Sequence, residues 1–327
     1  MNIFEQQRSN RRKTWLALLL FLAFFAVLGL GFDAFQLGTI NAVPLPVGTL
    51  AALGFGSTSA LVSYFAGDRA VLASTGALPA GDAIARAPTP DETLRLRQFE
   101  NVVDEMAIAA GLPRPKSYVV PDPDPNAFAT GRDPEHASIA VTRGLLETLN
   151  REELQGVVAH EMSHIRNFDI RLMTVVAALV GAVALISDWA VRGMGMRGLT
   201  GRSRRGHGGG AQLLFVLVWI LTAALAPIVS QMLATAISRR REFLADASGA
   251  ELTRNPLALA SALQKVDGAA APTKAIKRGS AHLCIADPTG RPLERREGRL
   301  ADLFATHPPV QQRVEALRRM AYQGVEG

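Results

Sequence analysis

The chain has 327 residues, of which 48% are hydrophobic and only 6% aromatic, and its formal net charge is +6. This length predicts one large domain or two ordinary ones. A single cysteine, Cys284, excludes an intramolecular disulfide framework and every cysteine-rich metal site. No nucleic-acid-binding motif accompanies the basic charge, so we attribute it to loops that face anionic lipid and expect no nucleic-acid partner.

Apolar residues are concentrated in four uncharged blocks, at residues 14–32, 47–66, 172–187 and 211–237. The first block is long enough to span the hydrocarbon core of a bilayer. It follows a cluster of basic residues, which places the N-terminus in the cytoplasm by the positive-inside rule. The last two blocks are joined by a loop rich in glycine and arginine. If both blocks crossed the membrane, this basic loop would lie outside the cell, against the positive-inside rule. The two blocks therefore form either two spans or a re-entrant hairpin. The sequence therefore predicts about four transmembrane helices in a lipid bilayer.

The polar segments between these blocks predict an α+β fold that is mainly helical and contains a small sheet. Helical spacing of apolar residues predicts a helix that ends at Gly111, and runs of β-forming residues predict short strands after it. We therefore expect four parts in the chain, which are a two-span anchor (1–67), a first cytoplasmic part (68–171), an apolar hairpin (172–237) and a second cytoplasmic part (238–327).

A His-Glu-x-x-His motif lies on a predicted helix in the first cytoplasmic part. His160 and His164 are four residues apart, so both imidazoles project from one helix face and can meet one tetrahedral metal. Glu161 lies beside the metal's open position, where it can take a proton from water. These residue types suit one zinc ion. The alternative is a pair of surface histidines that flank a glutamate on an amphipathic helix.

Such a site needs a third ligand from elsewhere in the chain. A metzincin continuation is excluded, because Asn167 and Ile170 stand where it requires glycine and histidine. The gluzincin solution is a glutamate from a second helix. Glu242 supplies it, and Asp246, four residues later on the same face, can accept a hydrogen bond from a ligand histidine, for which we choose His160.

The alternative for Glu242 is a surface ion pair with Arg239 or Arg240, which would contribute little to the stability of the fold. The combination of His-Glu-x-x-His with a later Glu-x-x-x-Asp is the more specific feature, so we favour the metal site.

With these segments, the chain resembles the HtpX family of membrane zinc endopeptidases, which is related to the CAAX prenyl endoproteases. The resemblance rests on four motifs, at residues 126–131, 157–164, 241–246 and 304–309. It implies zinc-dependent cleavage of misfolded or damaged membrane proteins at the cytoplasmic face of the bacterial plasma membrane. It also implies that His160, His164 and Glu242 are the ligands and that Glu161 is the base.

Two further segments are candidates for substrate contacts. Asn126, Ala127 and Phe128 belong to a strand that we expect at the edge of the cleft, where an extended polypeptide adds through backbone hydrogen bonds. The alternative is an ordinary edge strand. His307 is expected to stabilise the tetrahedral oxyanion, or else to belong to a capping turn before the last helix. Arg313 suits either purpose.

Two other functions remain open. One is a non-proteolytic membrane chaperone or scaffold with a structural zinc, and the other is a prenyl-protein endoprotease. A structural zinc is normally closed by four protein ligands, whereas this sequence offers three good ones, so we favour catalysis.

Overall fold

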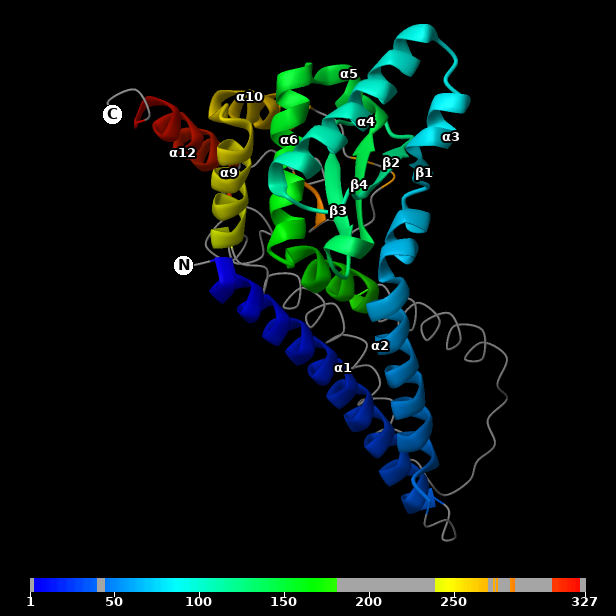
Figure 1. The fold of residues 1–327 in the computed structure, drawn as a ribbon. Coiled ribbons are helices and arrows are strands. Elements are labelled where there is room, and N and C mark those ends of the chain that lie inside the picture. Colours follow the sequence, from blue (N-terminus) through cyan, green and yellow to red (C-terminus); the bar gives the residue numbers. More distant parts are fainter. Residues whose placement is uncertain are drawn as a thin grey trace.

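The computed structural model describes residues 3–39, 45–180, 239–269, 273, 275, 283–285 and 308–323. In this part of the chain, two long helices extend away from a domain in which helices surround a small sheet (Figure 1). The expected mainly helical α+β architecture is confirmed for these residues.

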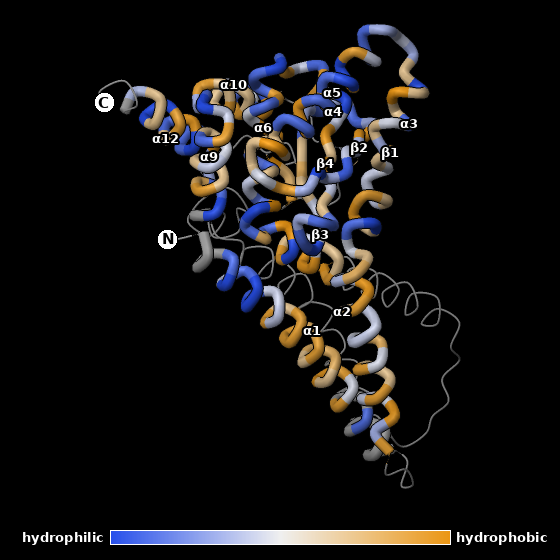
Figure 2. The backbone as a smooth tube through the Cα atoms, in the orientation of Figure 1, coloured by the Kyte–Doolittle hydropathy of each residue, from blue (hydrophilic) through white to orange (hydrophobic). Residues whose placement is uncertain are grey.

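The two long helices are α1 (Ile3–Thr39) and α2 (Val47–Ser74). The segments Gln7–Leu30 and Val47–Ser74 are long and apolar enough to cross a membrane, and Figure 2 shows apolar residues along both. Asp33 near the end of α1 accepts hydrogen bonds from the first backbone N–H groups of α2 and so joins the two helices.

Of the four predicted transmembrane helices, two are candidate spans among the described residues. A helix at residues 169–180 contains the first part of the third block, and its Val175 and Leu179 pack against Phe21 and Phe25 of α1. The fourth block and the loop rich in glycine and arginine lie outside the described residues.

A mixed four-stranded sheet has the order β1-β2-β4-β3. The central strands β2 (Lys116–Val120) and β4 (Ala137–Thr142) are parallel, while β1 (Leu78–Pro79) and β3 (Ala127–Gly131) pair antiparallel at the two edges. The predicted strands are confirmed. One edge of the sheet is thus β3, which packs against the helix that carries the His-Glu-x-x-His motif.

That helix, α6 (Arg151–Arg166), lies at the centre of the domain. A reciprocal pair of hydrogen bonds between Asn150 and Glu153 caps its first turn. Glu153 also accepts from Ser261 and Lys265, which fixes the neighbouring helix α10 against it. The other helices of the domain are α3 (Ala80–Ala85), α4 (Pro90–Ala110), η1 (Pro134–His136), α5 (Arg143–Thr148), α9 (Arg239–Thr253), α10 (Pro256–Asp267) and α12 (Val310–Gln323).

The helices α6 and α9 approach each other closely at Gly249. A Cβ atom at this position would lie 3.0 Å from the backbone nitrogen of His160 and 3.2 Å from its Cα. Both of these atoms belong to helical backbone, which cannot rotate away as a side chain can. The absence of a side chain at residue 249 therefore sets the separation of the two helices beside His160.

Replacement of Gly249 by alanine should lower stability by about 1–3 kcal/mol, because the added methyl group forces packed helices apart. The thermal unfolding midpoint of the purified protein in detergent measures this effect. Gly81→Ala is the matched control, since a Cβ at Gly81 in α3 meets no atom within 4 Å. A midpoint for Gly249→Ala equal to that of Gly81→Ala would contradict the close approach.

Candidate metal and catalytic site

Helices α6 and α9 bring the three predicted ligand residues together. His160 and His164 are one turn apart on α6, and their Nε2 atoms are 3.2 Å from each other. Glu242, near the start of α9, places Oε2 3.8 Å from Nε2 of His160 and Oε1 3.7 Å from Nε2 of His164. All three side chains are buried, and their potential ligand atoms lie within 4.8 Å of one another.

Each imidazole contacts a different carboxylate through its other ring nitrogen. His160 Nδ1 is 3.0 Å from Asp246 Oδ1, and His164 Nδ1 is 3.0 Å from Asp169 Oδ2. An ionised carboxylate only accepts hydrogen bonds, so both Nδ1 atoms donate. This fixes the tautomers and turns both Nε2 atoms toward Glu242.

The Nε2 geometry suits a bound cation. Two lone pairs 3.2 Å apart repel each other unless a positive charge lies between them. A tetrahedral zinc ion with bonds of about 2.0–2.1 Å separates its ligand atoms by about 3.3 Å. Two imidazoles and a carboxylate are also a common zinc donor set. The residues present therefore fit a zinc ion.

The charges around the cluster also favour a bound cation. Burial works to lower the pKa of His164, but the hydrogen bond to Asp169 and the charge of Glu242 outweigh it and raise the pKa to about 9. Burial, together with the charge of Glu242, raises the pKa of Glu161 to about 7. The shift of His164 shows that the buried carboxylates around it favour a positive charge in the site.

Glu161 lies beside this cluster and faces the edge strand. The backbone N–H of Ala129 in β3 donates to its carboxylate. Its Oε2 atom is buried and has no hydrogen-bond partner among the described residues. An unpaired buried carboxylate oxygen is costly, and it is available to accept a proton from a water molecule.

Arg313 of α12 is fully buried and contacts Asp246. Its Nε atom donates to Asp246 Oδ2 over 2.8 Å, and its Nη2 atom donates to Asp246 Oδ1 over 2.7 Å. Burial alone would raise the pKa of Asp246, but the guanidinium group lowers it. The structure thus gives Arg313 a contact that neither expected purpose included, because it holds the carboxylate that faces His160.

Asp169 belongs to the site although the sequence motifs do not include it. Phe168 adopts φ +58°, a left-handed conformation that is uncommon outside glycine, and it turns the chain back so that Asp169 faces His164. Asp169 is fully buried, and Asn10 donates to its Oδ1 atom over 2.6 Å. The signal in the sequence is an acidic residue five positions after His164, but spacing alone does not reveal the backbone turn.

The contact with Asn10 comes from the first turns of α1, which lie beneath the motif helix (Figure 1). Asn10 also donates to the carbonyl of Asn167, and Gln7 donates to the carbonyl of Arg166. These bonds satisfy carbonyl groups at the C-terminal end of α6. The helix expected to serve as an anchor is therefore also joined to the site.

The predicted substrate strand is buried, and another segment of the same chain, at residues 284 and 285, already pairs with it. Asn126, Ala127 and Phe128 are each at most 2% exposed. The backbone N–H of Ile285 donates to the Ala127 carbonyl over 2.9 Å, and Cys284 forms an antiparallel bridge with Phe128. A substrate strand at these residues would have to displace this segment.

Two predicted features cannot be placed. His307 lies outside the described residues, and so do the side chains of Arg239 and Arg240, the alternative partners of Glu242.

Comparison with known proteins gives a consistent result. The model of peptidase family M48 matches residues 93–321. A protein named "Protease HtpX homolog" from Caldanaerobacter subterraneus subsp. tengcongensis is 41% identical over 319 residues, covering 97% of this chain and 98% of the relative. A second "Protease HtpX homolog", from Streptococcus gordonii, is 40% identical over 318 residues, which cover 97% of this chain and 100% of the relative.

Among solved structures, Ste24p of S. mikatae aligns with a TM-score of 0.46 and 18% identity, covering 96% of this chain and 67% of that one. The family match covers more than half of the chain, and the two HtpX relatives align over nearly all of it. The chain therefore belongs to peptidase family M48, as a membrane metallopeptidase of the HtpX group.

Proposed function

We propose that this protein is a zinc-dependent endopeptidase that cleaves misfolded or damaged membrane proteins at the cytoplasmic face of the bacterial plasma membrane. The observation that carries the proposal is the convergence of His160, His164 and Glu242 beside Glu161, whose Oε2 atom has no hydrogen-bond partner in the described part of the chain. Three ligand side chains leave one tetrahedral position open, as catalytic zinc sites do.

The chain's own residues divide the chemistry among them. When bound by His160, His164 and Glu242, zinc would supply Lewis acidity that polarises the scissile carbonyl and acidifies the attacking water. Glu161 takes the proton from this water and later delivers it to the leaving amine, so that one water is consumed for each peptide bond broken. Asp246 and Asp169 hold the two imidazoles in the tautomer that presents Nε2.

The cytoplasmic location is supported by the basic end of α1. Arg8, Arg11, Arg12 and Lys13 lie in its first turns, and the positive-inside rule places such a cluster in the cytoplasm. Asn10, within the same turns, contacts Asp169 and so lies next to the site. The cluster and the site therefore share one side of the membrane.

A broad substrate range is supported by the position of β3. This edge strand lies beside Glu161, and its antiparallel bridge to Cys284 supports the pairing of a further extended segment with it. Backbone pairing of this kind depends little on side chains, which suits unfolded polypeptides. We propose that Asn126, Ala127 and Phe128 bind substrate in this way once residues 283–285 move aside, and that His307 stabilises the oxyanion.

The function is tested with full-length protein purified in the presence of a chelator. It is incubated with an unfolded membrane protein or with prenylated tetrapeptide ends, with and without added zinc. We expect cleavage of the unfolded protein only when zinc is added. Cleavage that does not depend on zinc would contradict the mechanism, cleavage of the prenylated ends alone would favour the prenyl-protein endoprotease, and zinc binding without any cleavage would favour the scaffold.

Replacement of Glu161 by glutamine should lower kcat by roughly 10²–10⁴-fold, since a positioned acid–base group contributes about that much. Zinc content, measured by elemental analysis, should stay at one ion per chain because Glu161 is not a ligand in this proposal. Glu147→Gln, on the exposed surface, is the control for the same change of charge. Full activity in Glu161→Gln would exclude Glu161 as the base.

Replacement of Asp169 by asparagine should weaken zinc binding by about 10–100-fold, because the hydrogen bond that orients His164 loses its charged acceptor. Competition with a chromophoric chelator measures the affinity without relying on activity. Asp133→Asn is a matched control, since Asp133 Oδ1 lies 2.6 Å from His136 Nδ1 in an exposed pair outside the site. Equal zinc affinity in both variants would show that Asp169 does not support zinc binding through His164.

A further inference from the structure

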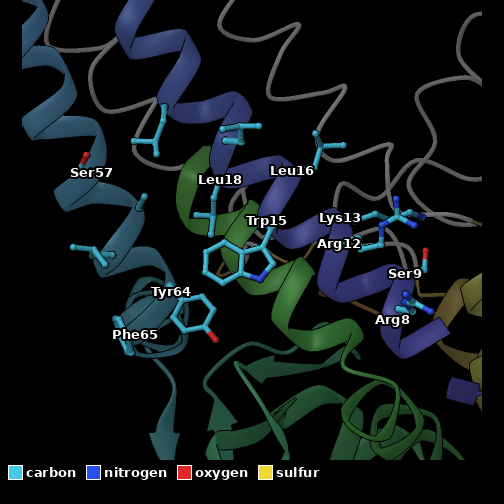
Figure 3. A pocket seen from close by; sticks show the side chains of 14 residues that line it. Arg8, Ser9, Arg12, Lys13, Trp15, Leu16, Leu18, Ser57, Tyr64 and Phe65 are labelled. Carbon is cyan, nitrogen blue, oxygen red and sulfur yellow. The ribbon is translucent and has the colours of Figure 1, made fainter. Parts of the chain in front are cut away.

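A large hollow lies between the first half of α1 and α2, and its described lining includes none of the three proposed metal ligands. Its volume is about 1240 Å³, and Figure 3 shows the lining side chains on the two helices. We call it the α1–α2 groove. Its apolar wall includes Trp15, Leu19, Leu61, Tyr64 and Phe65. Trp15 and Tyr64 stack across the groove, with ring centroids 6.3 Å apart.

One end of the groove is strongly basic. Arg8, Arg12 and Lys13 line it, together with the hydroxyl-bearing Ser9, and no acidic residue of the described part of the chain does. None of these three cations forms an ion pair with an acidic residue in the described part of the chain. Among the described residues, the basic end of the groove therefore has no carboxylate in direct contact.

The position of the groove matches the boundary of a membrane. The candidate span begins at Gln7, so the basic residues lie at its end and the apolar wall lies deeper within it. Tryptophan and tyrosine are enriched at this level of a bilayer, where their rings meet headgroups. Basic pockets between transmembrane helices on the cytoplasmic side suit anionic lipid headgroups.

We propose that the α1–α2 groove is a binding site for one anionic phospholipid. The phosphate of its headgroup contacts Arg8, Arg12 and Lys13, and its acyl chains lie along Trp15 and Leu61. A lipid with no net charge would leave the cations uncompensated. A free phosphate would leave the apolar wall exposed. This inference does not depend on the proteolytic function.

Trp15 provides a direct probe because it lines the groove and is 66% exposed. The full-length Trp189→Phe/Trp219→Phe variant has Trp15 as its one tryptophan. It is reconstituted in phosphatidylcholine vesicles that contain a small fraction of brominated phosphatidylglycerol or, in a parallel sample, brominated phosphatidylcholine. Bromine quenches fluorescence on contact, so we expect stronger quenching of Trp15 by phosphatidylglycerol. Equal quenching by the two lipids would overturn the proposal.

Two neighbouring arginines on α1 give a matched pair of variants. Arg12 lines the groove, whereas Arg11 lies 5.0 Å from the centroid of the Phe168 ring and does not line it. In the single-tryptophan background, Arg12→Gln should lower the preference for phosphatidylglycerol about fivefold, the amount expected for one cation near a membrane surface. Arg11→Gln should leave it unchanged. An equal loss in both variants would indicate diffuse surface charge and contradict a defined site.

A second variant and a competition with phosphate complete the test. Arg8→Gln tests the same contact independently and should also lower the preference, even if Arg12→Gln fails to fold. An excess of inorganic phosphate should leave the quenching unchanged. Loss of the phosphatidylglycerol preference in the presence of phosphate would show that the groove binds a free anion rather than a lipid.

Discussion

Two imidazole nitrogens held 3.2 Å apart, with each ring fixed from behind by a carboxylate, form the constraint on which the site depends. Such an arrangement is stable only when positive charge lies between the nitrogens. The surrounding structure maintains it from three directions. Gly249 allows α9 to approach α6, Arg313 holds the carboxylate that faces His160, and Asn10 holds the carboxylate that faces His164.

The features that sequence could predict are those set by local spacing. Residues four apart on a helix share a face, so the pairing of His160 with His164 and of Glu242 with Asp246 follows from their positions in the chain. The strands and the helix that ends at Gly111 follow from the same kind of local pattern, and Gly111 indeed has φ +64°. These predictions required no knowledge of how distant segments meet.

The features that sequence could not predict depend on distant contacts or on an unusual backbone turn. Asp169 reaches His164 because Phe168 adopts a left-handed conformation, and Asn10 reaches Asp169 from 159 residues away. The pairing of Ile285 with Ala127 likewise joins segments that no periodic pattern relates. As a result, α1 was expected to be an anchor alone, whereas its first turns also complete the surroundings of His164.

X-ray absorption spectroscopy at the zinc edge of the zinc-loaded protein tests the central claim most directly. Two imidazoles, one carboxylate and one solvent position predict about four nitrogen or oxygen neighbours at about 2.0–2.1 Å, with the multiple-scattering signal of two imidazole rings. Replacement of Glu242 by alanine should change this coordination while both rings remain. A spectrum with three or more imidazoles, with a sulfur neighbour, or with no change in the Glu242 variant would contradict the account.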